Sequence, residues 1–160
     1  MVDVVILDYG SGNLRSAERA LARAGADVTV TADLRAAAAA DGLVVPGVGA
    51  YAACMAGIAE AGAAPVIAER VAAGRPVLGI CVGMQILFEY GVEHGVRTAG
   101  LGLLPGGVTR LAAQRVPHMG WNAVDGPAGS ALFAGTGPGT RFYFGHSYAA
   151  LDVAGLRAAG

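Results

Sequence analysis

The stretch Pro76–Phe88, P-V-L-G-I-C-V-G-M-Q-I-L-F, determines how the rest of the chain is interpreted. It begins as a short apolar run after a Gly-Arg turn signal, which predicts a buried strand, and it ends with apolar residues at helical spacing. Cys81 lies between the two halves, with Gly79 two residues before it and Gly83 two residues after it. This spacing is typical of a nucleophile elbow in which cysteine replaces serine.

The spacing has a chemical reason. A sharp turn from strand to helix lifts the Cys81 thiol out of the sheet, and side chains at Gly79 or Gly83 would collide with neighbouring backbone. The sulfur then lies at the start of a helix, where backbone N–H groups face a developing oxyanion. The alternative is a buried free cysteine at the end of a strand, because cysteine is among the most buried residue types. The stretch alone leaves both interpretations open.

Length and composition narrow the class of protein. The 160 residues suit a single domain, and 54% hydrophobic against 14% charged residues predicts a substantial core rather than disorder. The formal net charge of -1 favours neither nucleic acid nor a membrane surface as a partner. Every apolar run is shorter than the ~18 residues that a membrane span needs.

Two further observations concern location and metal binding. The start, Met1-Val2-Asp3, lacks the charged segment of a signal peptide, so we expect a cytoplasmic protein with Cys54 and Cys81 reduced. Cys54 has neither glycine neighbours nor a basic partner, and we assign it to structure. No paired Cys/His spacing predicts a metal site, and we expect no cofactor. The Gly10-Ser11-Gly12 segment lacks the third glycine of a dinucleotide fingerprint and predicts only a tight loop.

The first half of the chain alternates strand and helix patterns. Strands are predicted at 4–7, 28–30, 43–45 and 76–80. Helices are predicted at 14–24 with Gly25 as the stop, at 33–40 with Asp33 as the cap, and at 51–70, where Pro65 opens a second piece. This alternation predicts an α/β fold with an open, mostly parallel sheet and flanking helices. The second half differs, with a glycine-rich loop over 91–107 and short β-like runs at 108–111, 121–124 and 141–148. These runs predict antiparallel additions within one domain spanning 1–160.

A second glycine-rich turn, Pro46-Gly47-Val48-Gly49, follows the predicted strand 43–45. It lies at the carboxyl end of a strand, where open α/β sheets bind their ligands. Glycines there allow backbone N–H groups to approach a ligand closely. An ordinary Pro-Gly turn explains the same residues, and the segment itself does not decide between the two.

Six segments together resemble a known family, the glutaminase subunits of imidazole glycerol phosphate synthase. These subunits are class I (triad-type) glutamine amidotransferases of histidine biosynthesis, with a flavodoxin-like fold. The segments are Asp8-Tyr9-Gly10-Ser11-Gly12-Asn13-Leu14, Pro46-Gly47-Val48-Gly49-Ala50, Gly79-Ile80-Cys81-Val82-Gly83-Met84-Gln85, Gly100-Leu101-Gly102, Pro117-His118-Met119-Gly120-Trp121-Asn122 and Phe142-Tyr143-Phe144-Gly145-His146-Ser147-Tyr148. The segments at 117–122 and 142–148 distinguish this family from other proteins with the same elbow.

The resemblance implies a catalytic apparatus. Cys81 matches the nucleophile that attacks the carboxamide of glutamine, forms a thioester and releases ammonia. The backbone of Val82, together with Val48 and Gly49, matches the oxyanion hole. The positions that hold the substrate glutamine match Gln85, Ser147 and Tyr148.

The resemblance also implies a partner. Asn13, Trp121 and Tyr143 lie in segments that the family uses against its cyclase subunit, a (β/α)₈ barrel that receives the ammonia in a heterodimer. Direct transfer has a physical advantage, because free ammonia would be protonated and lost to water.

One family segment has no counterpart in residues 1–160. The general base and the acid that orients it belong to a later His-Pro-Glu segment in the family, and we therefore expect this chain to be C-terminally incomplete. As 160 residues it should be inactive or nearly so, because a thiol nucleophile depends on a histidine. We also expect apolar surface of the sheet to be uncovered near the elbow.

The chain contains three histidines. His94 lies in a glycine-rich segment and is expected to be solvated, whereas structural or interface roles are expected for His118 and His146. Asp125 and Asp152 are the carboxylates that could orient either of the latter two. Two other functions remain open: a non-catalytic partner-binding module of the same fold, and another cysteine hydrolase with the same elbow.

Overall fold

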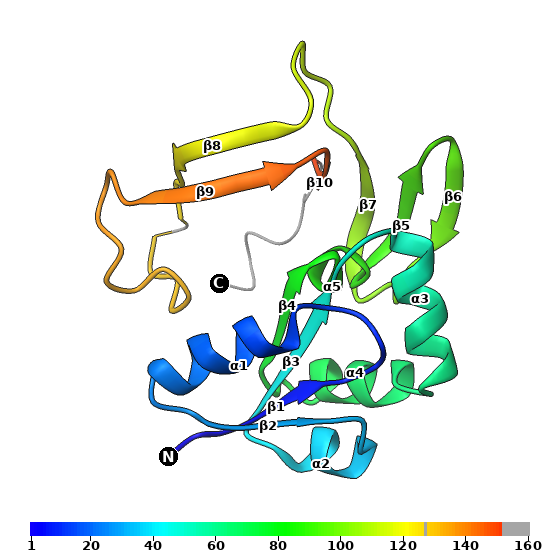
Figure 1. Ribbon diagram of the computed structural model, residues 1–160, viewed down its shortest axis with the longest axis vertical. Coiled ribbons are helices and arrows are strands. Elements are labelled where there is room, and N and C mark those ends of the chain that lie inside the picture. The colour runs from blue at the N-terminus through cyan, green and yellow to red at the C-terminus, as the bar shows by residue number, and fades with distance from the viewer. Residues whose placement is uncertain (127, 152–160) are drawn as a thin grey trace.

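The computed structural model of the chain describes residues 1–126 and 128–151. Figure 1 shows its elements, whose bounds are β1 (Asp3–Leu7), α1 (Leu14–Arg23), β2 (Asp27–Thr31), α2 (Leu34–Ala39), β3 (Gly42–Gly47), α3 (Tyr51–Glu60), α4 (Ala64–Ala72), β4 (Val77–Cys81), α5 (Val82–Gln85), β5 (Phe88–Glu93), β6 (Val96–Ala99), β7 (Leu104–Arg110), β8 (His118–Ala123), β9 (Arg141–His146) and β10 (Tyr148–Ala150).

The first four strands form a parallel sheet in the order β2-β1-β3-β4. The predicted α/β fold and the predicted strands of the first half are confirmed. From β1 the chain first forms β2 on one side of β1 and then β3 on the other side. The strand order therefore reverses between β1 and β3, which makes this position the switch point of the sheet. Loops at the carboxyl ends of such strands form the ligand sites of open α/β folds.

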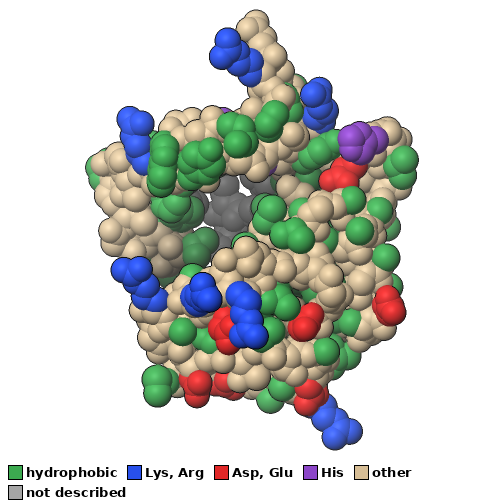
Figure 2. Space-filling model, in the orientation of Figure 1, with side chains coloured by type: hydrophobic (Ala, Val, Ile, Leu, Met, Phe, Trp, Pro, Cys, Tyr) green, Lys and Arg blue, Asp and Glu red, His purple; other side chains and the backbone are tan. Residues whose placement is uncertain are grey.

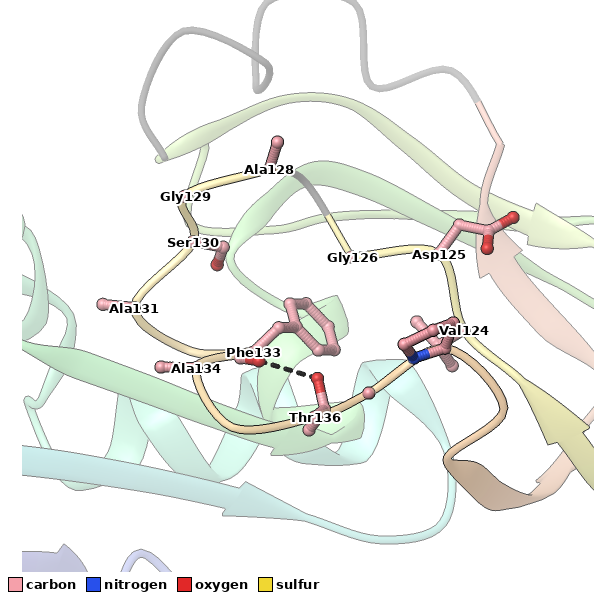
Figure 3. A pocket seen from close by; sticks show the side chains of 12 residues that line it. Val124, Asp125, Gly126, Ala128, Gly129, Ser130, Ala131, Phe133, Ala134 and Thr136 are labelled. Atoms are coloured by element: carbon pink, nitrogen blue, oxygen red, sulfur yellow. Dashed lines mark hydrogen bonds between the residues drawn. The ribbon is translucent and has the colours of Figure 1, made fainter.

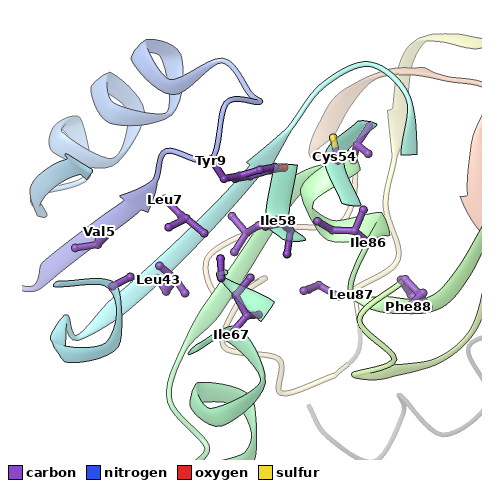
Figure 4. Packing of buried hydrophobic residues seen from close by; sticks show 14 of the residues in the cluster. Val5, Leu7, Tyr9, Leu43, Cys54, Ile58, Ile67, Ile86, Leu87 and Phe88 are labelled. Carbon is purple, nitrogen blue, oxygen red and sulfur yellow. The ribbon is translucent and has the colours of Figure 1, made fainter. Parts of the chain in front are cut away.

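Helices cover both faces of this sheet. One cluster of buried side chains joins α1 to the sheet through Ala17, Val4 and Val44. A larger cluster lies on the other face, where β1 and β3 contact α2, α3, α4 and α5, and Figure 4 shows Leu7, Ile58, Ile67 and Ile86 within it. Apolar residues on both faces explain why β1 and β3 have nearly continuous hydrophobic sequences.

Helix boundaries follow the predicted signals. Asp33 accepts a hydrogen bond from the backbone N–H of Arg35 at 2.8 Å and caps α2. Gly25 follows α1 with φ +95°, a left-handed conformation that favours glycine. Pro65 lies in the first turn of α4, as expected for a second helical segment after α3.

The segment after α5 differs from the prediction. Helical spacing was expected to continue to Phe88 and a loop to follow from Gly91, but β5 begins at Phe88 and pairs with β6 in a hairpin. Tertiary contact explains the difference, because a Cβ at Gly91 would lie 2.4 Å from the ring of Tyr51. The glycine therefore permits close packing of a strand on α3.

The remaining strands form the additions predicted for the second half. One sheet has the order β10-β7-β5-β6, and β8 pairs with β9 in a separate antiparallel ribbon. Three of these four strand pairs are antiparallel, whereas β5 and β7 run parallel. The expected uncovered surface is also observed, since Leu78, Ile80 and Met84 are each 38% exposed along β4 and α5.

Within the described residues, no single helix is long and apolar enough to cross a membrane. The pair formed by α3 and α4 passes the length and composition test together, but it is bent by 93°.

Candidate active site

Cys81 ends β4 immediately before α5, and its side chain is exposed. Its backbone has φ 57° and ψ −123°, a region that residues other than glycine rarely occupy. Such strain costs about 1–3 kcal/mol and occurs where a site requires one side-chain position. The predicted elbow is therefore present, and the alternative of a cysteine buried in the core is excluded.

The two elbow glycines are required by backbone contacts. A Cβ at Gly83 would lie 2.0 Å from the carbonyl oxygen of Val45, and a Cβ at Gly79 would lie 2.3 Å from the Cα of Met84. Gly47 is equally restricted, because its Cβ would lie 2.4 Å from the backbone nitrogen of Gly83. The predicted collisions are confirmed, and they bring the end of β3 against the start of α5.

An open cavity of about 440 Å³ surrounds the thiol. Its lining comes from the turn after β3, from the elbow, from the tip of the β5–β6 hairpin and from the adjoining ends of β8 and β9. A second, more apolar cavity of about 520 Å³ adjoins it and shares Cys81 and Gln85. The site therefore combines an exposed sulfur with backbone and polar groups from both halves of the chain.

Of the three residues expected to form the oxyanion hole, two line the cavity and one is hydrogen-bonded elsewhere. Gly49 and Val82 line the cavity with Cys81. The N–H of Val48 instead donates to the hydroxyl of Ser11 at 3.1 Å, and the carbonyl of Val48 accepts from the same hydroxyl at 3.2 Å. The backbone N–H of Val48 is therefore already hydrogen-bonded to the loop formed by residues 8–13.

The loop that holds Val48 is itself well anchored. The hydroxyl of Tyr9 donates to the carbonyl of Pro46 at 2.5 Å, and burial raises the pKa of Tyr9, so this group remains a donor. Cys54, fully buried, donates to the carbonyl of Val48 at 3.4 Å. Figure 4 shows Tyr9 and Cys54 in the buried cluster, in agreement with a structural role for Cys54.

The three residues expected to hold substrate lie together at the cavity. Gln85, Ser147 and Tyr148 all line it. Gln85 is 8% exposed, and its side-chain amide donates to the carbonyl of Tyr148 at 3.4 Å. This contact joins α5 to β10, so residues 63 positions apart in sequence form one wall.

The two histidines of the β8–β9 ribbon are engaged with each other. Nδ1 of His146 lies 3.0 Å from the carbonyl oxygen of Tyr148, so this nitrogen carries the proton and donates. Nε2 of His146 therefore accepts from Nδ1 of His118 at 3.1 Å. Both nitrogens of His146 are occupied, and Cys81 makes no hydrogen bond to any residue that the structure describes.

The carboxylates considered as orienting groups do not join this pair. Asp125 lines a different cavity, of about 550 Å³, formed by the loop between β8 and β9 and shown in Figure 3. In the described part of the chain it has no hydrogen bond to either histidine. Asp152 lies outside the described residues.

The residues expected to contact a partner lie in two regions. Trp121 and Tyr143 are opposite each other on β8 and β9, 63% and 58% exposed, with ring centroids 5.5 Å apart. Asn13 instead caps α1, accepting from the N–H of Ser16 at 3.3 Å. Exposed aromatic residues of this kind are enriched at protein–protein interfaces.

Two ionisable residues of the cavity lie outside the six family segments and were not assigned to the site from the sequence. Glu93 and His94 both line the cavity, and His94 is exposed there, as expected for a solvated histidine. Glu93 accepts a hydrogen bond from the N–H of Tyr51 at 3.0 Å, which ties the hairpin to the start of α3. The His94-Gly95 dipeptide, which suits a two-residue hairpin turn, is the one signal that could have predicted this arrangement.

Comparison with known sequences identifies the family. The profile described as glutamine amidotransferase class-I matches residues 5–157. A Mycobacterium tuberculosis protein named imidazole glycerol phosphate synthase subunit HisH is 69% identical over 147 residues, which cover 92% of this chain and 71% of that protein. Proteins of the same name from Streptomyces avermitilis and Thermobifida fusca are 63% and 65% identical, and the matches cover 72% and 69% of their lengths.

A solved structure is also similar. A protein described as a glutamine amidotransferase matches with a TM-score of 0.61 and 25% sequence identity. The match covers 74% of this chain and 62% of that one.

Proposed function

Because this chain belongs to the class-I glutamine amidotransferase family, we propose that it is the glutaminase subunit of an imidazole glycerol phosphate synthase. It hydrolyses glutamine to glutamate and ammonia and passes the ammonia to a barrel-shaped cyclase subunit in a cytoplasmic heterodimer. The observation that carries the proposal is the exposed, strained Cys81 in a cavity lined by the turn after β3.

The chemistry follows from this position. The sulfur of Cys81 attacks the carboxamide carbon of glutamine, and the carbonyl electrons move to oxygen. The backbone N–H groups of Val82 and Gly49 stabilise that oxyanion. When the intermediate collapses, the C–N bond breaks and the nitrogen leaves as ammonia, carrying the proton that the thiol of Cys81 gave up. Water then hydrolyses the thioester to glutamate and restores the thiol.

Val48 takes part only after a change of hydrogen bonds. Its N–H donates to Ser11, so that group serves an oxyanion once the Val48–Ser11 bond is broken and the peptide turns toward Cys81. A hydrogen bond of this kind contributes about 1 kcal/mol to stability, so the free energy of binding a substrate or partner is sufficient to offset the loss of the Val48–Ser11 bond.

The substrate is held by the walls of the cavity. Gln85, Ser147 and Tyr148 contact the glutamine along the elbow and β10 side. Glu93 offers one carboxylate oxygen to the α-ammonium group while the other accepts from Tyr51. Opposite charge makes this the strongest class of hydrogen bond in the site.

A hydrolysis assay tests the proposal. A chimera joins residues 1–150 to the C-terminal remainder of the Mycobacterium tuberculosis relative and is mixed with a barrel cyclase subunit. Ammonia release from L-glutamine is expected from the chimera, and little or none from the 160-residue chain, because both nitrogens of His146 are engaged. A folded chimera that binds the cyclase but releases no ammonia would refute the assignment.

A second function has one observation in its favour. Cys81 makes no hydrogen bond to a histidine within the described residues, as expected for a partner-docking module without catalysis. An inactive chimera that still binds the cyclase supports this alternative. A third candidate, another cysteine hydrolase, predicts hydrolysis without any cyclase binding.

Trp121→Ala is expected to weaken binding to the cyclase by about tenfold or more, since large exposed aromatic residues carry much of the binding energy of an interface. Surface plasmon resonance with immobilised cyclase measures the effect. Leu132→Ala is the control, because Leu132 is also exposed but lies in the loop between β8 and β9. Equal affinities of the two variants would remove Trp121 from the interface.

A further inference from the structure

The cavity around Cys81 contains few side chains that can carry a positive charge and so bind an anionic group of a ligand. Its ionisable lining side chains are Cys81, Glu93, His94, His146 and Tyr148, with no arginine among the described lining residues. A free amino acid such as glutamine carries an α-carboxylate as well as an α-ammonium group. The amide of Gln85 and the hydroxyls of Ser147 and Tyr148 are neutral donors, so the two histidines are the described lining side chains that can carry a positive charge opposite this carboxylate.

Only one of the two histidines is available. His146 donates its Nδ1 proton to Tyr148 and accepts from His118 at Nε2, so its ring has no free position. His94 makes no hydrogen bond with any described residue, and its side chain is exposed at the cavity. Its ring nitrogens are free to donate to a ligand.

The hairpin holds His94 at this place. Glu93 and Val96 are paired, so His94 and Gly95 form the two-residue turn between β5 and β6. Their φ angles of 51° and 79° are those of a turn with two left-handed residues. Figure 2, a space-filling view in the orientation of Figure 1, shows a histidine side chain at the surface with an acidic side chain next to it. Glu93 is tied to the first residue of α3, which fixes the turn relative to the cavity.

We propose that His94 binds the α-carboxylate of glutamine and thereby makes the site selective for the free amino acid. The inference rests on the proposed function and deepens it. Glu93 and His94 are consecutive, so one hairpin tip offers an acceptor for the ammonium group and a donor for the carboxylate. In L-glutaminamide a neutral amide replaces the α-carboxylate, so His94 should not strengthen the binding of this ligand.

Ligand titration of the 160-residue chain tests this inference without requiring catalysis. L-Glutamine and L-glutaminamide are each titrated under the same conditions, and binding is followed by NMR. His94→Gly removes the ring and keeps the turn, because glycine adopts the same left-handed backbone. Val96→Ala is the matched control, since Val96 is 63% exposed on the same hairpin.

The expected result is a loss of about tenfold in glutamine affinity for His94→Gly, with glutaminamide affinity unchanged and Val96→Ala like the parent for both ligands. If His94→Gly binds glutamine as well as the parent does, the carboxylate is held by backbone N–H groups and the inference is overturned. An equal loss for both ligands would also overturn it. If the parent binds neither ligand, the proposed function itself fails.

Discussion

Cys81→Ser is expected to lower glutamine hydrolysis by the chimera about a thousandfold or more. The hydroxyl of serine is a far weaker nucleophile than a thiol, and removal of a nucleophile eliminates the covalent pathway. The strained elbow holds this sulfur in the cavity, and no other described residue of the cavity offers a thiol. Ammonia release at saturating glutamine measures the effect.

Cys54→Ala is the matched control for this substitution. Cys54 is fully buried and contacts Val48 rather than the cavity, so its loss should change the rate by less than about tenfold. Retention of the full rate by Cys81→Ser would show that Cys81 is not the nucleophile. A thousandfold loss in Cys54→Ala, with Cys81→Ser unaffected, would transfer the role to the other cysteine.

Gly83→Ala is expected to destabilise the chain by at least about 3 kcal/mol. The added methyl group would lie 2.0 Å from the carbonyl oxygen of Val45 and 2.7 Å from the carbonyl carbon of Pro46. Both atoms belong to backbone that cannot move without disturbing β3, so the cost lies at the upper end of the overpacking range. Urea unfolding followed by circular dichroism measures the change.

The chain offers a glycine with no such restriction. A Cβ at Gly137 has no neighbour within 4 Å, so Gly137→Ala should change stability by less than about 0.5 kcal/mol. Equal unfolding midpoints for the two variants would contradict the close approach of β3 and α5 at the elbow.

The elbow and the central sheet could be predicted because their signals are local. Gly79 and Gly83 flank Cys81 at fixed spacing, and the backbone contacts at both positions explain why only glycine is possible. The strands β1 and β3 are buried on both faces, so β1 after Asp3 and β3 have nearly continuous apolar sequences. Such patterns remain visible without knowledge of tertiary contacts.

The β5–β6 hairpin could not be predicted in the same way. Phe88 continues the helical spacing of the preceding residues, and Gly91 weakens any strand pattern. What decides the structure is the ring of Tyr51 packed against Gly91, a contact between residues 40 positions apart. Because the hairpin was missed, Glu93 and His94 were not assigned to the cavity.

The state of the oxyanion turn also depends on contacts that sequence does not reveal. The segment 46–49 was predicted as a turn after a strand ending at 45, but β3 continues through Pro46 and Gly47, so only Val48 and Gly49 follow the strand. The hydrogen bond from the N–H of Val48 to Ser11 joins it to a loop 37 residues earlier in the chain. No spacing rule predicts this bond, although it determines which amides face the Cys81 cavity.

The most direct test of Cys81 as the nucleophile of a glutamine site is alkylation of the 160-residue chain by a diazoketone analogue of L-glutamine, followed by peptide mass mapping. The thiol proton is transferred to the diazo carbon, and the sulfur then displaces dinitrogen to form a stable thioether. One adduct per chain is expected, on Cys81 and not on Cys54, with L-glutamine slowing the reaction. Labelling of Cys54 instead, or labelling of Cys81 at a rate that glutamine does not change, would contradict the assignment.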